Sequence, residues 1–275
     1  MIKLSVFTSM TDPGSRNDPY KEAISCYEDF ADELIIVGEN WPYEFKFDQI
    51  GKVFHEGFEK STGDWAIRMD LDYFFHENDL NEIKKFLIKN SDSPAIAFPQ
   101  YQFFTYDRYH LKTKLCIALN KKKFPEIKLN GGGDMCQPTI DGKQILHSSV
   151  PKANIPIWQY DSMFRTKEII AEDRARFARA WYKQFNDWGD RGGGTEEEAF
   201  IAWFEMIKDK YKKHVLRKKI SDHPKYIQNR ILNLNENEFG YDAFGLKSTT
   251  RRSLRDYIKG YKEIYFESMV LIYSS

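Results

Sequence analysis

Short apolar runs alternate with stretches of helical spacing in the N-terminal part of the chain. Four runs have the length and composition of buried strands, at 3–9, 34–37, 65–69 and 95–98. Between the first two runs, one helix face is marked by Tyr20, Ile24, Tyr27 and Phe30. A short helix is expected over 52–60, and another one after Asp79, which is expected to cap it. This alternation predicts an α/β fold with a parallel sheet covered by helices.

The pattern loosens between 101 and 149, and it turns helical after Thr166. A last strand is expected over 155–160. Three helices are expected beyond it, at 169–185, 199–207 and 252–266. Thr195 and Glu198 have the spacing of a capping box, and Asp18 before Pro19 predicts an N-cap followed by the first helical residue. The sequence therefore predicts an α/β domain over 1–165 and a helical extension over 166–275.

The charge balance argues against one class of function. The chain has 41 basic and 41 acidic residues, so it lacks the general positive field of a nucleic-acid binder. No apolar run approaches the roughly 20 residues that cross a bilayer. No signal peptide is recognised, and the three cysteines fit a reducing compartment, so we expect a cytoplasmic protein. The basic stretch 208–219 leaves open a solvated helix face and a peripheral membrane contact.

Two carboxylates stand directly after the apolar run at 65–69. Asp70 and Asp72 are two residues apart, so in an extended segment they project to the same side. Ligands of open α/β sheets bind outside the carboxyl ends of the strands, and two acids there repel each other unless a cation neutralises them. A hard divalent ion with phosphate oxygens completing its shell fits this arrangement. An Asp-x-Asp triplet alone is common by chance, so the surrounding sequence decides its meaning.

That surrounding sequence is Lys60-Ser61-Thr62-Gly63-Asp64-Trp65-Ala66-Ile67-Arg68-Met69-Asp70-Leu71-Asp72. It resembles the "A-T-G-D-W-x-x-x-x-D-A-D-E" segment of inverting glycosyltransferases of family two, which have the GT-A fold. The segments 4–9, 32–37, 157–160 and 165–168 resemble other parts of that family in the same order. The resemblance implies a GT-A sheet that transfers a sugar, with inversion, from a nucleotide-diphosphate donor to a hydroxyl of a glycan or other acceptor. A UDP-sugar is the favoured donor.

The resemblance also assigns the metal and nucleotide contacts. Asp72 would coordinate Mn²⁺ or Mg²⁺, and Asp70 would contact the ribose or join the metal shell. Thr8 and Ser9, at the end of the first strand, would border the nucleotide.

Further contacts to the base and the phosphates follow from the same resemblance. Glu39 stands near the family's base-binding Asp, although Gly38 occupies the equivalent position itself. Lys52 stands where family members often place a basic residue near the base and phosphates. Arg165 and Lys52 could assist the departing diphosphate, since guanidinium and ammonium groups bind phosphate strongly.

Two roles have more than one candidate. Many family members add a late histidine as a metal ligand; the matching position here is Gln159, with His147 as the alternative under a shifted alignment. The general base that takes the acceptor proton is expected at Asp134, because the three preceding glycines let backbone approach the substrate. Asp107 and Glu126 are the alternatives.

Two other functions compete with the glycosyltransferase. A sugar nucleotidyltransferase shares a related core, but it usually has a glycine-rich loop with a basic residue after the first strand, which Asp12-Pro13-Gly14-Ser15-Arg16 imitates poorly. A non-catalytic carbohydrate-binding protein could retain the fold without turnover. Sugar, acceptor, linkage and oligomeric state are not specified by any motif.

Overall fold

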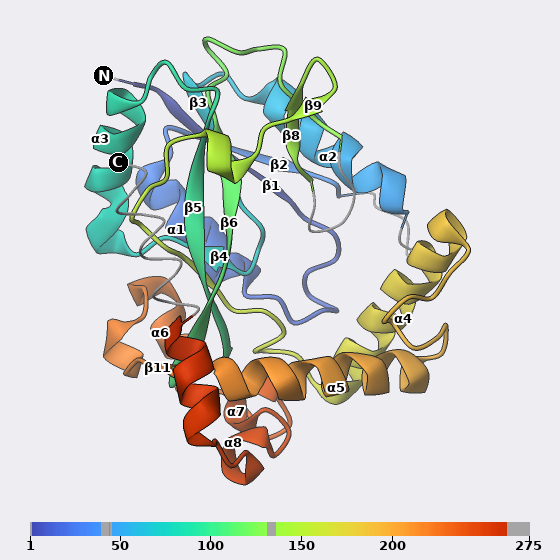
Figure 1. The fold of residues 1–275 in the computed structure, drawn as a ribbon. Helices are drawn as coiled ribbons and strands as arrows, with labels where there is room; N and C mark the ends of the chain where they lie inside the picture. The colour runs from blue at the N-terminus through green and yellow to red at the C-terminus, as the bar shows by residue number, and fades with distance from the viewer. Residues whose placement is uncertain (1, 40–43, 45, 131–135, 263–275) are drawn as a thin grey trace.

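A mixed β-sheet with helices on both faces forms the centre of the protein. The computed structural model describes residues 2–39, 44, 46–130 and 136–262. Within these ranges the strand order is β2-β1-β3-β6-β5-β10-β4, and β11 pairs with β6 (Figure 1). The strands of this sheet are β1 (Leu4–Ser9), β2 (Glu33–Val37), β3 (Trp65–Arg68), β4 (Tyr73–Phe74), β5 (Ala95–Thr105), β6 (Arg108–Leu119), β10 (Ile157–Gln159) and β11 (Leu216–Arg217). A small second sheet contains β7 (Lys128–Leu129), β8 (Pro138–Ile140) and β9 (Lys143–Gln144).

The strand–helix–strand prediction for the N-terminal part is confirmed. β1 lies between β2 and β3 and is parallel to both. Leu4 and Val6 point to one face of the sheet, where they join α1 (Tyr20–Phe30), α3 (Leu80–Lys89) and α6 (Lys225–Leu232) in one core cluster. Phe7 points to the other face and packs edge-on against Phe54 and Phe58 of α2 (Phe47–Lys60). The period of two along a strand thus divides the core into two layers.

The expected helix starts differ from those observed. α2 begins at Phe47, earlier than the expected 52–60. The N-cap of α1 is Pro19, whose ring offers no hydrogen-bonding group, and the carboxylate of Asp18 accepts from Arg165. A 3-10 turn, η1 (Glu77–Asp79), precedes α3, and Asp79 caps that helix without a side-chain hydrogen bond. Since Pro19 occupies the N-cap position of α1, the prediction of Asp18 as that N-cap was wrong.

The segment after residue 100 is more regular than the sequence pattern indicated. β5 and β6 form a long antiparallel hairpin, and the expected strand over 95–98 was too short. The register shifts between Phe98 and Gln100. Before this irregularity Ile96 and Phe98 face the α1 side, whereas after it Phe103 does, so Gln100 and Gln102 turn to the opposite face. A one-residue slip reverses the faces of a strand, and this hides the alternation from sequence inspection.

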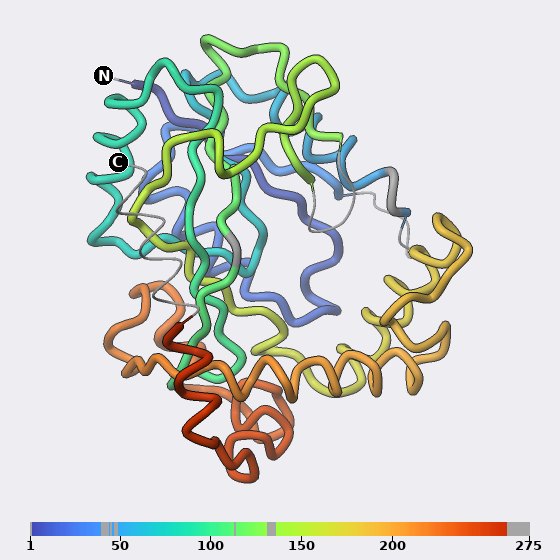
Figure 2. Tube along the Cα trace, in the orientation of Figure 1, coloured from blue at the N-terminus to red at the C-terminus, as the bar shows by residue number. Residues whose placement is uncertain are grey.

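The helical C-terminal region is confirmed. The helices beyond residue 166 are α4 (Lys167–Phe185), α5 (Glu196–Lys213), α6, α7 (Phe239–Asp242), α8 (Leu246–Thr249) and a helical stretch over 254–262. The capping box of Thr195 and Glu198 is present at the start of α5. α4 and α5 form a hairpin, with α5 along the lower part of the molecule and α4 rising at the right, where it contacts α2 (Figures 1 and 2). The pairing of β11 with β6 fixes the chain after α5 to the central sheet.

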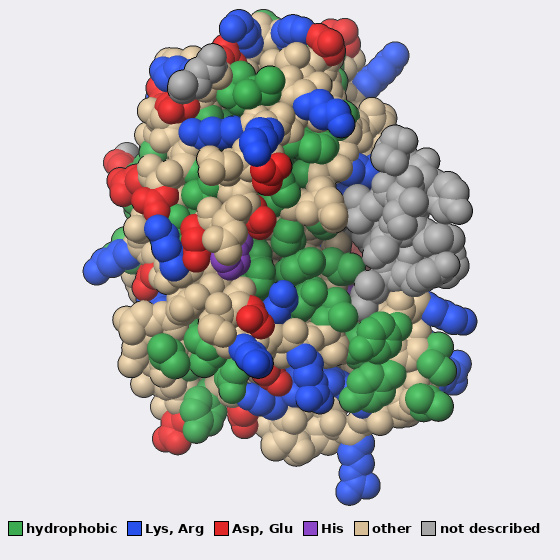
Figure 3. Space-filling model, turned by 90° about the vertical axis from the view of Figure 1, so that its left-hand side faces the viewer, with side chains coloured by type: hydrophobic (Ala, Val, Ile, Leu, Met, Phe, Trp, Pro, Cys, Tyr) green, Lys and Arg blue, Asp and Glu red, His purple; other side chains and the backbone are tan. Residues whose placement is uncertain are grey.

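The surface on the α3 side carries both signs of charge. Lysine and arginine side chains alternate there with acidic ones and with hydrophobic patches (Figure 3). This face therefore offers no single-sign field of the kind that binds nucleic acid. Among the described residues, no helix has the length and apolar character that crossing a membrane requires.

Candidate functional site

A cavity of about 710 Å³ opens at the carboxyl ends of β1, β3 and β10. Its wall includes the loop after β1, the turn after β3, two residues of α2 and the facing sides of α4 and α5. Its volume lies within the range of pockets that bind small molecules and cofactors. Several predicted site residues line it, namely Ser9, Asp70, Asp72, Gln159 and Arg165.

Asp70 and Asp72 occupy a turn, not the extended segment that the sequence suggested. The backbone N–H of Tyr73 donates to the carbonyl of Asp70 at 2.8 Å and closes the turn. The hydroxyl of Tyr27 donates to the carbonyls of Asp70 and Tyr73 at 2.6 and 3.0 Å. Both aspartates line the cavity, so the turn brings the two carboxyl groups to the same side, as the extended segment was expected to do.

Asp72 is the most perturbed carboxyl group in the cavity. Burial and the neighbouring charges of Asp70 and Asp161 together raise its pKa to about 8, against a smaller opposing effect of Arg165. Gln159 donates from Nε2 to Oδ2 of Asp72 at 3.3 Å. Near neutral pH this carboxyl binds a proton unless a cation replaces it. The position therefore has a strong electrostatic preference for added positive charge.

Asp70 has an oxygen that no other group among the described residues uses. Oδ2 lies 3.5 Å from Nη2 of Arg68, whereas the buried Oδ1 has no hydrogen-bond partner among the described residues. A buried carboxylate oxygen without a partner is costly, so it favours a ligand at this place. Within the same ranges, no group of three His, Cys, Asp or Glu residues could hold a metal ion. The donor set fits a hard cation that takes two carboxylates from the protein and its remaining ligands from phosphate oxygens and water.

Of the two alternatives for a further metal ligand, only Gln159 lies at the cavity. Its Oε1 accepts from Nε2 of Gln100 at 3.5 Å, so in this orientation its amide nitrogen, not its oxygen, faces Asp72. Amide orientation is assigned from such networks, and a cation at Asp72 would favour the flipped amide. His147 lies in the 3-10 turn η3 (His147–Ser149), where it is exposed and does not line the cavity.

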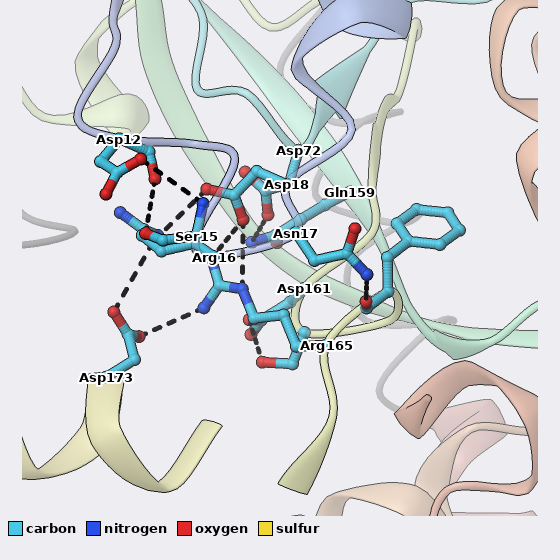
Figure 4. A network of polar contacts seen from close by, with 12 residues as sticks. Asp12, Ser15, Arg16, Asn17, Asp18, Asp72, Gln159, Asp161, Arg165 and Asp173 are labelled. Carbon is cyan, nitrogen blue, oxygen red and sulfur yellow. Dashed lines mark hydrogen bonds and ion pairs between the residues drawn. The ribbon is translucent and has the colours of Figure 1, made fainter. Parts of the chain in front are cut away.

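Arg165 belongs to a buried ion-pair network (Figure 4). Nε and Nη2 donate to Oδ1 of Asp18 at 3.1 and 2.6 Å, and Nη1 donates to Asp173 at 3.2 Å. Arg16 lies 3.3 Å from Asp18 and 3.8 Å from Asp173. These contacts join the loop after β1 to the start of α4. A phosphate contact by Arg165, as the sequence suggested, requires sharing its donors with two carboxylates.

The predicted nucleotide contacts are divided between the cavity and the surrounding protein. Ser9 lines the cavity, whereas Thr8 is fully buried and its Oγ1 has no partner among the described residues. Glu39 and Lys52 are exposed and do not line the cavity. From α2 the cavity wall receives two apolar side chains instead, Ile50 and Phe54.

The expected general base, Asp134, lies outside the described residues. Its alternatives are placed away from the cavity wall. Asp107 forms ion pairs with Arg108 at 3.2 Å and Lys247 at 3.7 Å, and Glu126 is exposed in the connection after β6.

Asp161 is a cavity residue that the sequence interpretation missed. It follows β10 at the same distance at which Asp70 follows β3, so the strand-end rule could have found it. Oδ2 accepts from Gln102 at 3.1 Å, and Oδ1 accepts from Ser162 at 3.1 Å. Burial raises its pKa, but Arg174 and other cations outweigh this and hold the pKa below the ordinary value. Asp161 is therefore an oriented, ionised carboxylate.

The wall opposite the sheet combines aromatic and basic side chains. Arg174 lies 3.6 Å from Asp161, and its guanidinium stands 5.6 Å from the ring centroid of Trp203. Arg191 stands 5.3 Å from the ring of Phe177. Rings of this kind offer flat apolar faces to a sugar or a base. The sequence placed Phe177 and Trp203 only within two expected helices, at 169–185 and 199–207.

No family profile and no curated protein matches the chain. Among solved structures, TarS 1-349 of S. aureus aligns with 97% of this chain and 92% of its own, at 10% identity and a TM-score of 0.35. Its complex with UDP-GlcNAc aligns over the same shares at 11% identity and a TM-score of 0.33. At these TM-scores the likeness establishes neither a shared family nor a shared function.

Proposed function

We propose that this protein is a glycosyltransferase that binds a nucleotide-diphosphate sugar, with a UDP-sugar favoured, in the cavity at Asp70 and Asp72. The observation that carries the proposal is the pairing of a carboxyl group with a strongly raised pKa, Asp72, and a carboxylate with an unpartnered buried oxygen, Asp70. Both lie at the end of a strand in a cavity of suitable size. The sequence run 60–72, with its resemblance to family-two enzymes, supports the same assignment.

Mn²⁺ or Mg²⁺ is the proposed cofactor. Asp72 and Asp70 would hold it, and Gln159 would contribute its carbonyl oxygen after an amide flip. When bound, a divalent ion neutralises the charge that develops on the departing diphosphate. Arg16, which lines the cavity beside Asp18, is placed to support the phosphates from the loop after β1.

The proposed transfer is a single displacement with inversion. The acceptor hydroxyl attacks the anomeric carbon, the bond to the diphosphate breaks, and a carboxylate takes the hydroxyl proton. Asp134 is the base that the sequence favours, and Asp161 is a second candidate. Gln102 and Ser162 fix the orientation of Asp161, and its lowered pKa keeps it ionised, the form that a general base requires.

The donor site is tested by calorimetric titration with UDP, GDP, CMP and dTDP, each with and without Mn²⁺. We expect one nucleotide to bind in a metal-dependent manner and this binding to be lost in Asp72→Ala. The matched control is Asp92→Ala, which changes an exposed aspartate that does not line the cavity. Absence of nucleotide binding by the wild-type protein under both conditions would refute the proposal.

A non-catalytic carbohydrate-binding protein is the second candidate. The observation that favours it is the small number of metal ligands, two carboxylates and one amide, among the described residues. Turnover separates the two candidates. A binding protein retains glycan affinity in Asp72→Ala and hydrolyses or transfers no sugar from any donor, whereas the transferase loses activity in that variant.

A further inference from the structure

One side of the last helical stretch of the described chain, 254–262, packs against the protein. Ser253 and Asp256 cap its start, with Ser253 N–H donating to Oδ2 of Asp256 at 2.9 Å and Asp256 N–H donating to Ser253 Oγ at 3.2 Å. Gly260 lies against the chain after α5: a Cβ at this position would stand 2.9 Å from Val215 and 3.1 Å from the carbonyl oxygen of Lys213. Figure 1 shows this helix in red beside the end of α5.

The opposite side of the helix exposes apolar residues. Leu254 is 77% exposed, Ile258 47% and Tyr261 54%. Their spacing of four and three residues places them on one helix face. Leu254 is more exposed than any other large hydrophobic residue in the described ranges. We call these three residues the apolar stripe.

Basic residues flank the apolar stripe. Arg255, Lys259 and Lys262 are exposed, and each follows a stripe residue by one position, so they share the neighbouring face. Asp256 is the one acidic residue between 251 and 262, and its carboxylate is used by the cap at Ser253. The helix therefore presents an apolar line with positive charge beside it.

We propose that helix 254–262 docks onto the surface of an anionic lipid bilayer. The apolar stripe would enter the boundary between headgroups and acyl chains, and the three basic residues would contact the anionic headgroups. A basic amphipathic helix lying in the membrane interface has this distribution of side chains.

A second copy of this chain is a poorer occupant of the stripe. Stable protein interfaces bury about 800 Å² on each partner, which three side chains do not provide. Two such helices packed stripe to stripe would also bring their basic flanks close together, and like charges repel. An anionic lipid surface offers an apolar layer to the stripe and negative charge to the basic residues beside it. This proposal does not depend on the proposed enzymatic function.

The test is co-sedimentation of the full chain with vesicles of phosphatidylcholine alone and of phosphatidylcholine with phosphatidylglycerol. We expect binding to the anionic vesicles that weakens as salt is added. Arg255→Gln/Lys259→Gln/Lys262→Gln should lower this binding on the order of 100-fold. Leu254→Ser/Ile258→Ser should lower it without removing the salt dependence.

A matched control changes two exposed apolar residues on other helices, Ile88→Ser/Leu232→Ser, and should leave vesicle binding unchanged. Circular dichroism of each variant checks that its helix content is that of the wild type. The proposal is overturned if the wild-type protein binds neither vesicle type, or if both helix variants bind as the wild type does. A concentration-dependent dimer that Leu254→Ser/Ile258→Ser dissolves, without vesicle binding, would assign the stripe to a second copy instead.

Discussion

Gln159 donates a hydrogen bond from Nε2 to Oδ2 of Asp72 across 3.3 Å, and it accepts one from Gln100. Asp72 follows β3, and Gln159 ends β10, so this contact joins two parts of the chain at the cavity floor. Beside a carboxylate that is proposed to bind a metal ion, an amide can have one of two roles. Its nitrogen can donate a hydrogen bond that orients the carboxylate, or its oxygen can coordinate the same ion. The first predictions concern this pair.

Gln159→Leu should weaken metal-dependent nucleotide binding roughly 10- to 100-fold, the usual effect of losing a group that orients a metal ligand. Leucine fills similar space but cannot donate to Asp72 or offer an oxygen to the cation. Calorimetric titration with the nucleotide that binds the wild type, in the presence of Mn²⁺, measures the change. Gln144→Leu, on exposed β9, is the control. Equal affinity of the Gln159 variant and the wild type would show that Gln159 has neither role.

Asp72→Asn should stabilise the metal-free protein at neutral and alkaline pH. The pKa of Asp72 is raised in the folded state to about 8, so its contribution to stability is complete below the unfolded pKa and is lost as pH rises through 8. Asparagine does not ionise and escapes this loss, which should be on the order of 1–3 kcal/mol because the cavity admits water.

Urea denaturation of the metal-free proteins at about pH 5 and about pH 9 measures this difference. The variant should gain stability relative to the wild type at the higher pH and little at the lower one. Asp92→Asn, which changes an exposed carboxyl group, should show the same pH dependence as the wild type. A wild-type protein whose stability does not fall relative to Asp72→Asn would contradict the raised pKa.

Asp161→Asn should lower kcat roughly 100- to 10,000-fold if Asp161 is the general base. Asparagine has the size and shape of aspartate and can still contact Gln102 and Ser162, but it cannot take the proton of the acceptor hydroxyl. Nucleotide affinity should change little, because the amide still fills the same position. Steady-state kinetics with the donor and acceptor identified for the wild type supply the measurement.

The comparison variant for this experiment is Asp134→Asn, which tests the base that the sequence favours. A large loss in kcat for Asp134→Asn alone would assign the base to that residue and leave Asp161 with a role in orienting Arg174. A large loss in Asp161→Asn alone would make the opposite assignment.

Arg165→Met should destabilise the protein by roughly 1.5–3 kcal/mol, since Asp18 and Asp173 lose charge-assisted hydrogen bonds from a buried guanidinium. Asp18 would keep Arg16 but lose the hydrogen bonds from Arg165. Arg179→Met is the control, because that arginine is 38% exposed and its ion pair with Glu44 lies at the surface. Its effect should stay below about 1 kcal/mol. If both variants lose similar amounts of unfolding free energy, the buried network of Figure 4 stabilises the fold no more than a surface ion pair does.

The sequence by itself determined the α/β class, the order of β1, α1, β2, α2 and β3, and the position of Asp70 and Asp72 after a buried strand. These features depend on local periodicity and on neighbouring residues, which the sequence displays directly. The capping box at Thr195 belongs to the same group, because its two side chains lie within one helical turn.

Only the tertiary structure decided which polar residues meet at the cavity. The register shift between Phe98 and Gln100 turns two glutamines toward Gln159 and Asp161, and such a shift leaves no regular trace in the hydrophobic pattern. The sequence could not show whether Arg165 binds a phosphate or pairs with a carboxylate. Its partner Asp18 lies 147 residues away in the chain. Contacts between such distant segments form only when the chain folds, and the order of residues along the chain does not display them.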